Sequence, residues 1–401
     1  MVVKVSKPEL NLREKISELD KPSGVAGEAM LRADTPQEQF NLIGAGRRNL
    51  LINGDQRIDQ RNGGSSLTLN DWSGYATDRM RFGARPSTGT ATIQQVADAP
   101  EGFYHSAKIS RLTGSAGASN YYNLLTKIEG NDIAHSGIGT DSAQDITISF
   151  WVKSNLTGTW SVGLQNEVGG GDRRSYNTEY TINSASVWEY KTVTIPLLQS
   201  GVWYYDNRAG LQLHFDLGSG SSYTNTTLNQ WQSANILASA NAVKFFETAS
   251  ATWQITGVQL ELGKVATPFE HRSYGEELAL CQRYFCTGFP VGATVAEGQS
   301  VVGTNDGING WVAFGNNVAR SPYIHYPVNM RASPSVTLYS VGGMANGKWG
   351  IYDGSAWQAV GTTAIDTTNK HFNVRENGSS FTMGVGKAYL LKGQWTASAE
   401  L

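Results

Sequence analysis

The sequence predicts a mainly β protein, and three observations carry this prediction. Apolar and polar residues alternate with a period of two in several segments, such as QDITISFWVKS. The chain holds 45 glycines, 11 tryptophans and 17 tyrosines, a composition typical of strands joined by many turns. Tight-turn dipeptides such as Asn346-Gly347 lie between short strand-like runs. The expected order is an extended or helical N-terminal arm, a jelly-roll β-sandwich, a short connector helix and a C-terminal β-sandwich-like tip domain.

The arm, residues 1–48, differs in composition from the rest of the chain. Lysine and arginine occupy 8 of its positions and aspartate and glutamate occupy 7, whereas 16% of the whole chain is charged. Its one aromatic residue, Phe40, cannot build a core. Thr35 and Glu38 form a capping box, which predicts a short helix that either leans on a neighbour or is only a linker. We therefore predict an attachment arm that ends where the folded part begins.

Residues 49–271 are predicted to form the jelly-roll sandwich. In QDITISFWVKS one face carries the apolar side chains Ile146, Ile148, Phe150 and Val152. The other face carries Thr147, Ser149 and Trp151. WEYKTVTIPL, GLQLHFDLG and ATWQITGVQLELG continue the strand-like pattern, and Gly257 in the last of these predicts a β-bulge. Strands joined by Gly/Ser/Asn loops without regular helices between them indicate an antiparallel sandwich.

A connector helix is predicted within residues 272–286. Ser273 and Glu276 form a second capping box, and Leu278, Cys281 and Phe285 fall on one helical side. Such a helix packs on its own sandwich or lies at a trimer axis, and the sequence leaves both options open. Cys281 and Cys286 are too few for a disulfide scaffold, and their spacing points them in different directions, so free thiols are expected.

The tip domain, residues 287–401, is predicted to be a second β unit. Asp353-Gly354 and Asn377-Gly378 add tight-turn signals to that at Asn346-Gly347. The region has 13 charged residues and many aromatic ones. Few charges and many aromatics predict a binding surface, burial against neighbouring subunits, or ordinary core packing. The candidate tip-binding residues are Trp311, Tyr323, Tyr326, Trp349 and Trp357.

The search for catalytic chemistry finds no consistent constellation. GGMANGKW has the spacing of a phosphate loop, but Trp349 replaces the hydroxyl residue that would hold magnesium. No nucleophile elbow occurs, and the six histidines form no metal-ligand pair. A formal net charge of −2 gives no reason to expect nucleic acid, and no window approaches a membrane span. We therefore predict a protein that is not an enzyme, binds no nucleic acid and does not insert into membranes.

Sugar binding fits the composition better than catalysis. Aromatic rings can stack on the C–H faces of sugars, while amide, carboxylate and guanidinium groups bond to the hydroxyls. Three segments, GVWYYDNRAG, SNYYN and DWSGYATDRMRF, combine these residue types. The candidate glycan-binding residues are Trp203, Tyr204, Tyr205, Asp206, Asn207, Arg208, Tyr121, Tyr122, Trp72, Tyr75 and Arg79. Loop aromatics also serve as lids over a core or as subunit contacts, so these alternatives stay open.

Several segments carry a resemblance to a known family. LLINGDQRIDQR, YATDRMRF and especially ITGVQLELGKVATPFEHRSYGEELALCQRYF resemble phage fibre and receptor-binding proteins. The arm resembles their virion-proximal segment, and YPVNMRASPSVTLYS and GQWTASAEL resemble their distal domain. The resemblance implies a jelly roll similar to carbohydrate-binding modules, a homotrimer, and an arm docked on virion tail or capsid proteins. It also implies recognition of a host surface glycan without catalysis, and a place in the virion after assembly in the host cytoplasm.

Two details of the resemblance concern individual residues. Relatives usually carry a tryptophan after YATDR, where this chain has Met80. A methionine is a mild change if that position packs in the core, but it removes a platform if the position holds sugar. Some carbohydrate-binding jelly rolls carry a structural calcium, for which Asp55 and Glu261 are the candidate ligands here. No other cofactor is expected.

Two alternative functions remain open at this stage. A purely structural virion protein, such as a head fibre or tail adaptor, would share the arm and the trimer but bind no glycan. A polysaccharide-degrading enzyme, or the binding module of one, would share the sandwich but cleave or deliver a substrate.

Overall fold

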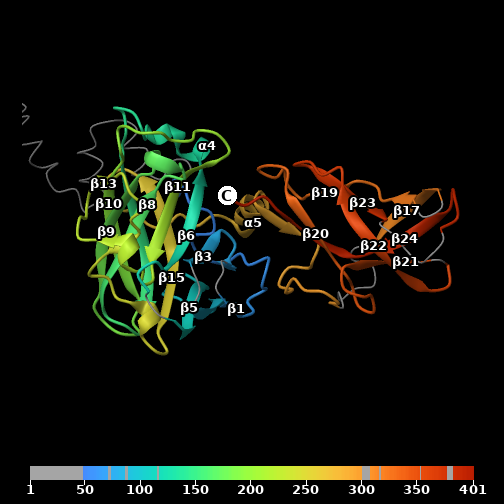
Figure 1. Cartoon of the computed structure of the whole chain (residues 1–401), viewed down its shortest axis with the longest axis horizontal. Coiled ribbons are helices and arrows are strands. Elements are labelled where there is room, and N and C mark those ends of the chain that lie inside the picture. Colours follow the sequence, from blue (N-terminus) through green and yellow to red (C-terminus); the bar gives the residue numbers. More distant parts are fainter. Residues whose placement is uncertain are drawn as a thin grey trace, which may run out of the picture. The chain divides into compact units, whose positions relative to one another are not determined.

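The computed structural model describes residues 48–70, 74–85, 89–114, 117–299, 308–315, 318–352, 354–376 and 383–401. The chain divides into two units, 1–48 and 49–401. The predicted arm, apart from Arg48, and its short helix lie outside the described residues. The described part is mainly β, as predicted (Figure 1). None of the helices within it is long and apolar enough to cross a membrane.

The sandwich consists of two antiparallel sheets (Figure 1). The six-stranded sheet has the order β1 (Leu67–Asn70), β4 (Thr90–Val96), β5 (Ser106–Thr113), β15 (Thr252–Leu262), β7 (Asp145–Ser154) and β10 (Glu189–Pro196). The seven-stranded sheet has the order β13 (Trp231–Gln232), β9 (Ser175–Ile182), β8 (Gly158–Gln165), β11 (Ala209–Asp216), β6 (Tyr121–Glu129), β3 (Met80–Arg85) and β2 (Gly74–Thr77). The strands predicted from QDITISFWVKS, WEYKTVTIPL, GLQLHFDLG and ATWQITGVQLELG are β7, β10, β11 and β15.

The apolar faces of the two sheets form one core. Phe150 of β7 meets Phe215 of β11 edge-on, with ring centroids 5.0 Å apart. Met80 is fully buried in the same core. The position after YATDR therefore packs inside the sandwich and is not a surface platform.

Gly257 forms the predicted bulge in β15. Its φ is +61°, a left-handed conformation that favours glycine, and the pairing with β7 shifts register between Thr256 and Gln259. A Cβ at Gly257 would lie 2.7 Å from Phe103 and 3.1 Å from Trp151. The glycine therefore lets two aromatic side chains approach the backbone of the strand.

A segment at residues 220–242, the strap, covers part of the outer face of the seven-stranded sheet. It contains the short strands β12 (Thr224–Asn225) and β14 (Ala238–Ser239), which pair in parallel. The outward side chain of Asn177 donates to Ile236 O at 2.8 Å, and that of Ser175 donates to Ala234 O at 2.8 Å. The polar residues of this face are thus used to hold the strap.

His214 is a fully buried part of this contact. Its Nε2 lies 3.1 Å from Asn177 Oδ1 and 3.0 Å from Leu237 O. Both neighbours are acceptors, so Nε2 carries the hydrogen. Burial lowers the pKa of His214 to about 4. The imidazole is therefore neutral near neutral pH.

The connector helix α5 (Tyr274–Gln282) begins at its predicted cap. The Ser273 hydroxyl accepts a hydrogen bond from Glu276 N at 3.3 Å. Phe285, predicted on the helix, instead begins strand β16 (Phe285–Thr287), because Tyr284 N closes the last turn on Cys281 O. Cys281 and Cys286 are buried free thiols, as predicted.

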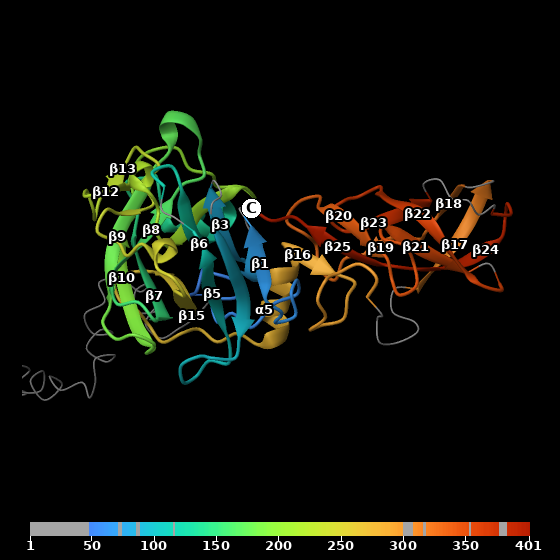
Figure 2. The same cartoon turned by 60° about the horizontal axis from the view of Figure 1, so that its bottom comes forward.

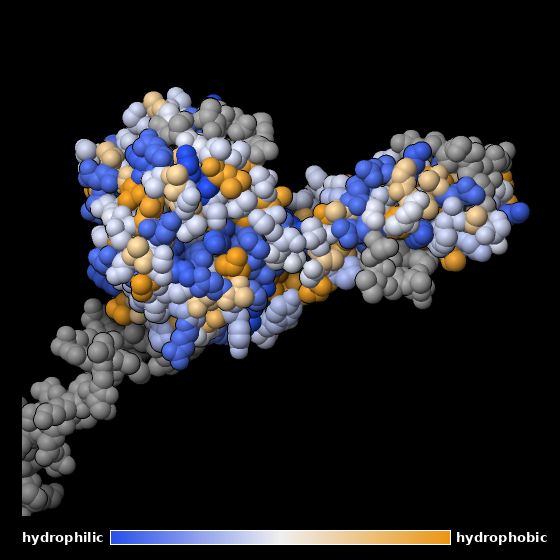
Figure 3. All heavy atoms as spheres, turned by 90° about the horizontal axis from the view of Figure 1, so that it is seen from below, coloured by the Kyte–Doolittle hydropathy of each residue, from blue (hydrophilic) through white to orange (hydrophobic). Residues whose placement is uncertain are grey.

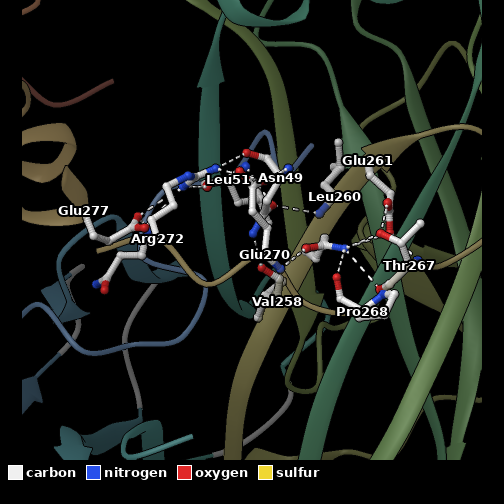
Figure 4. A network of polar contacts seen from close by, with 12 residues as sticks. Asn49, Leu51, Val258, Leu260, Glu261, Thr267, Pro268, Glu270, Arg272 and Glu277 are labelled. Carbon is white, nitrogen blue, oxygen red and sulfur yellow. Dashed lines mark hydrogen bonds and ion pairs between the residues drawn. The ribbon is translucent and has the colours of Figure 1, made fainter. Parts of the chain in front are cut away.

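Hydrogen bonds attach α5, which is labelled in Figure 2, to its own sandwich (Figure 4). Buried Arg272 donates to Leu51 O at 3.1 Å and pairs with Glu277 at 3.3 Å. Asn49 Oδ1 accepts from Leu51 N and from Leu260 N on β15, at 3.0 and 3.1 Å. Of the two options for this helix, packing on the sandwich is thus present, whereas a trimer-axis role stays a prediction.

The tip domain contains two sheets. The three-stranded sheet has the order β16, β25 (Gln394–Ser398) and β20 (Ser335–Tyr339). The other has the order β18 (Val318–Arg320), β17 (Ile308–Gly315), β24 (Ala388–Lys392), β21 (Lys348–Tyr352), β22 (Trp357–Ile365), β23 (His371–Glu376) and β19 (Ile324–His325). Their core includes Trp349, Phe372 and Trp395.

The tight-turn signals of the tip have different outcomes. The turn at Gly354 joins β21 and β22, which pair as a hairpin. The turn at Asn346-Gly347 joins β20 and β21. These strands belong to different sheets and do not pair with each other, so the hairpin prediction there is wrong. Asn377-Gly378 lies outside the described residues. Shorter elements complete the fold: α4 (Gly130–Ile133), η1 (Ala134–Ser136), η2 (Gly170–Asp172), η3 (Ser221–Tyr223) and η4 (Phe245–Glu247).

Candidate functional site

The loop at residues 203–208, the leading glycan-binding candidate from sequence, is occupied by contacts within the chain. Trp203 is 6% exposed, its ring meets Trp231 edge-on at 5.6 Å, and its Nε1 donates to Ser200 O at 3.0 Å. A ring in the core cannot stack on a sugar. The assignment of Trp203 to a glycan platform is therefore wrong.

The other side chains of this loop pair with one another. The Arg208 guanidinium lies 3.6 Å from the Tyr204 ring centroid and is bonded to Asp206 at 2.8 to 3.0 Å. Tyr205 is partly exposed, but its hydroxyl donates to Ile138 O at 2.6 Å. Asn207 O accepts from Arg331. The loop thus offers a sugar few free hydrogen-bonding groups.

The SNYYN and YATDR candidates are also largely engaged. Tyr122 is 1% exposed and stacks on Phe246 at 3.8 Å, so it belongs to the core and its glycan assignment is wrong. Tyr121 is half-buried and meets Tyr223 edge-on. The ring of Tyr75 is covered by the Arg61 guanidinium, 4.0 Å from its centroid. Trp72 lies outside the described residues.

Arg79 belongs to a buried ionic cluster with Arg61, Asp78 and Glu400, the junction cluster. Arg61 bonds to Asp78 at 2.9 Å and to Glu400 at 2.8 Å, and Arg79 pairs with Glu400. Burial acts to raise the pKa of Glu400, but Arg79 and Arg61 lower it more, so it lies below its usual value. Arg79 therefore holds the fold together and is not a glycan contact, which corrects the sequence assignment.

The tip candidates divide by burial. Trp349 is fully buried, and Tyr326 packs between Phe372 and Trp395, so neither presents a binding surface and both assignments are wrong. Tyr323 is 54% exposed beside His371, with ring centroids 4.2 Å apart. Trp357 is half-buried on the outer face of its sheet. The side chain of Trp311 lies outside the described residues.

The two calcium candidates serve other partners. Asp55 pairs with Arg57 at 2.7 Å. Glu261 accepts from Thr267 N at 2.9 Å and from Gln259 Nε2 at 2.9 Å. Within the described ranges, no group of three or more histidine, cysteine, aspartate or glutamate side chains is placed to hold a metal. Because calcium takes six to eight oxygen ligands, these residues do not fit the predicted site.

A different group of residues combines one exposed ring and two half-buried rings with a half-exposed carboxylate. It lies on the outer face of the six-stranded sheet and is called here the sandwich platform. It consists of Trp151, Trp188, Tyr190, Asp98, Lys153 and Gln254. The sequence analysis placed Trp151 on the outward face but did not connect it with the others.

Strand register brings the aromatic members together. Tyr190 on β10 is directly opposite Trp151 on β7, and their ring centroids are 5.4 Å apart at an angle of 50°. Trp188 immediately precedes β10, and the Lys153 ammonium lies 5.0 Å from its ring centroid. Tyr190 is 44% exposed. Three rings thus line one end of a sheet face.

Asp98, on the β4–β5 loop, organises the polar members. Its carboxylate pairs with Lys153 and accepts from Trp188 Nε1 and Gln254 Nε2, each at 3.2 Å. Partial burial acts to raise the pKa of Asp98, but the hydrogen bonds from Lys153 and Trp188 lower it more, so the net pKa is below its usual value. The carboxylate is therefore ionised near neutral pH and half-exposed.

Gln254 Oε1 and Thr256 Oγ1 are buried, and neither has a hydrogen-bond partner among the described residues. A buried polar atom without a partner costs free energy, commonly about 1–3 kcal/mol. A ligand hydroxyl or a water that reached these atoms would therefore be favoured.

The surface view shows one face of the molecule coloured by hydropathy (Figure 3). On this face the hydrophobic residues form small, separate patches among hydrophilic ones. Such a surface is typical of a polar ligand site or an ordinary exposed surface, since protein-binding faces show larger apolar patches.

Comparison with known proteins identifies no family. No family model matches the chain, and no curated protein matches its sequence. Among solved structures, the enzymatically active domain of tailspike protein 4 of bacteriophage CBA120 is similar, with 13% identity and a TM-score of 0.28. That match covers 54% of this chain but only 21% of the tailspike chain.

Carbohydrate-binding modules are also among the similar structures. The family 11 module from Clostridium thermocellum, solved with a mixed-linked tetrasaccharide, has 15% identity and a TM-score of 0.25, covering 51% of this chain and 98% of the module. A family 30 module has 11% identity and a TM-score of 0.27, and the match covers 56% of this chain and 97% of the module.

Proposed function

We propose that this chain is a noncatalytic phage virion fibre protein that binds a host surface glycan through the sandwich platform. The observation that carries the glycan part is the grouping of Trp151, Trp188 and Tyr190 around the ionised Asp98. The virion part rests on the resemblance of the sequence segments to phage fibre proteins.

The platform supplies both kinds of contact that a sugar ring needs. The C–H face of a sugar packs on the exposed ring of Tyr190 and on the neighbouring indoles, which also exclude water from the contact. Asp98 accepts hydrogen bonds from hydroxyl groups, and hydrogen bonds to a charged partner contribute about 1.5–3 kcal/mol each. Gln254 Nε2 donates to the carboxylate and helps to hold it in place. Lys153 fixes the carboxylate and donates to ring oxygens.

The protonation state of Asp98 favours binding over hydrolysis. A glycosidase needs a carboxylic acid with a raised pKa to protonate the leaving group, together with a second carboxylate. Asp98 has a lowered pKa because Lys153 and Trp188 stabilise its charged form. It is therefore suited to accept hydrogen bonds and not to donate a proton.

In the proposed assembly, three chains form a homotrimer whose arms, residues 1–48, dock on tail or capsid proteins of the virion. Three weak sites on one fibre, and several fibres on one particle, raise the avidity without any new contact. The trimer would have a mass of about 130 kDa, from a chain mass of 43.4 kDa.

The test combines a glycan array with mass determination, using full-length protein. We expect a trimer that binds at least one glycan, and about 10-fold weaker binding by the variants Trp188→Ala and Tyr190→Ala. Tyr274→Ala is the matched control, because Tyr274 is similarly exposed but lies on α5. A trimer that binds no glycan would favour a purely structural virion protein. Release of reducing ends from the bound polysaccharide would contradict the noncatalytic assignment.

A further inference from the structure

The tip domain carries a second aromatic surface, on the outer face of its seven-stranded sheet. Tyr352 on β21 is directly opposite Trp357 on β22 and Leu390 on β24. The residues that alternate with these, such as Trp349 and Ile351, fill the core. Tyr352, Trp357 and Leu390 therefore form one row across three neighbouring strands, facing away from the core.

The next rows on this face are small or cationic. Gly350 is paired with both Ala359 and Lys392, and Lys348 is paired with Gly361. Because side chains on a strand alternate, all of these residues lie on the same face as Tyr352. The tip platform consists of the aromatic pair Tyr352 and Trp357, Leu390, the floor of Gly350 and Ala359, and the two lysines, Lys348 and Lys392.

The aromatic pair of the tip repeats the geometry of the pair on the sandwich. The ring centroids of Tyr352 and Trp357 are 5.4 Å apart at 49°, against 5.4 Å and 50° for Trp151 and Tyr190. Tyr352 donates its hydroxyl hydrogen to Gly354 O at 3.2 Å, which fixes the ring. Both pairs are cross-strand pairs on an outer sheet face. The tip therefore presents an apolar surface of the same kind, formed by Tyr352 and Trp357.

The charge around the tip pair differs from that on the sandwich. The Lys392 ammonium lies 4.4 Å from the Trp357 ring centroid. A Cβ at Gly350 would be 2.9 Å from Lys392 Cε, so the glycine leaves room for the lysine stem to lie across the strand. Lys348 is exposed on the same face. Of the acidic residues that the structure describes, none forms an ion pair with either lysine.

We propose that the tip platform is a second ligand site, and that its ligand is an acidic sugar, one whose ring carries a carboxylate. The sugar ring packs on Trp357 and Tyr352 over the floor of Gly350 and Ala359. Its carboxylate pairs with Lys392 and Lys348, neither of which forms an ion pair with an acidic residue that the structure describes. The site is separate from the sandwich platform, where Asp98 supplies the opposite charge.

The choice of an acidic sugar follows from competition at Lys392. A half-exposed lysine over an indole gains little from the aromatic face. A charge-assisted hydrogen bond to a carboxylate contributes more, so the ammonium leaves the ring for the ligand and uncovers the ring face. A neutral sugar offers no such exchange and has to compete with the lysine for Trp357.

The test uses trigalacturonic acid and its methyl ester, which have the same rings with and without charge. Binding to the full-length protein is followed by calorimetry and by saturation-transfer NMR. We expect the acid to bind at least about 10-fold more tightly than the ester, and Lys392→Gln to abolish this preference. Trp357→Ala should weaken the binding of trigalacturonic acid about 10-fold, while Trp357→Phe should retain most of that binding.

The controls separate this proposal from the function proposed above. Tyr190→Ala, on the sandwich, should leave binding of trigalacturonic acid unchanged. Lys392→Gln is a surface change whose thermal midpoint should match that of the unaltered protein. Equal affinity for acid and ester, loss of binding in Tyr190→Ala, or no binding of either probe would overturn the proposal. Dissociation of the assembly by Trp357→Ala would also overturn it, because the tip platform would then be a contact between copies of the chain.

Discussion

The sandwich and the tip each carry a tyrosine and a tryptophan facing one another across neighbouring strands, at the same centroid distance of 5.4 Å. The two pairs differ in what surrounds them. Beside Trp151 and Tyr190 lie an ionised carboxylate, a lysine and an amide. Beside Tyr352 and Trp357 lie two lysines and a floor of small residues. In the functions proposed above, the aromatic pair supplies affinity for a sugar ring, while its polar neighbours determine which sugar is preferred.

The largest expected effect comes from breaking what both domains share, the junction cluster. In Arg79→Met, buried Glu400 loses a cationic partner, and the ring of Tyr284 loses the guanidinium 3.5 Å from its centroid. We expect the free energy of unfolding to fall by about 3–5 kcal/mol. Chemical denaturation measures this, with exposed Arg85→Met, at the end of the strand that follows Arg79, as a control that changes it by about 0.5 kcal/mol or less. An unchanged midpoint in Arg79→Met would contradict the role assigned to the cluster.

Acid should destabilise the sandwich through His214, which is buried in that domain and has no part in the tip. Burial lowers the pKa of His214 to about 4 from an ordinary value of 6.5, so between these pH values the unfolded state binds the proton more readily. Stability is therefore complete above pH 6.5 and is lost as the pH falls toward 4, by about 3 kcal/mol.

The measurement is the free energy of unfolding at pH 7 and pH 4, for the unaltered protein and for His214→Gln. We expect the variant to show a smaller loss in acid, because glutamine does not titrate. His135→Gln, an exposed control on the same domain, should keep the full pH dependence. The same slope in all three proteins would show that His214 does not carry this effect.

Gly257→Ala should damage the sandwich platform and leave the tip platform intact. A left-handed φ at alanine, with contacts to Phe103 and Trp151, is expected to cost about 1–3 kcal/mol of stability and to displace the Trp151 ring. Gly298→Ala is a matched control, since its φ of +69° is similar but a Cβ there meets nothing within 4 Å. Loss of array binding in Gly257→Ala alone would confirm that the bulge positions the platform.

The smallest effect sharpens the electrostatic difference between the platforms. Trp188→Phe keeps an apolar ring but removes the Nε1 hydrogen bond to Asp98. The pKa of Asp98 should then rise toward its usual value, and glycan binding should weaken by about 0.5–1.5 kcal/mol. NMR titration of the Asp98 carboxyl measures the first effect directly. If the pKa does not move, the indole does not stabilise the charged carboxylate.

Much of the fold could be predicted because its signals are local. The alternation in residues 145–154 gives both the strand β7 and its outward Trp151. Ser273 caps α5 and Gly257 forms the bulge, and each depends on the chemistry of one or two neighbouring residues. The wrong hairpin prediction at Asn346-Gly347 shows the limit of local signals. The strand before this turn, β20, pairs with β25, which is far away in the sequence.

The site was predicted less well because burial and long-range pairing decide it. GVWYYDNRAG has the right residue types, but the sequence does not show that Trp203 packs against Trp231 or that Arg208 covers Tyr204. Asp98 and Trp188 are 90 residues apart in the sequence and meet only through the β4–β5 loop. The signal that could have found the platform was the outward Trp151, extended to a neighbouring strand that also carries an exposed aromatic.

The most direct test of the central claim compares three full-length proteins on one glycan array: the unaltered chain, Tyr190→Ala and Trp357→Ala. The account predicts that Tyr190→Ala loses the glycans held by the sandwich and keeps the acidic sugars, and that Trp357→Ala shows the reverse. Array profiles that are the same for all three proteins would contradict it, because the glycans would then bind elsewhere or not at all.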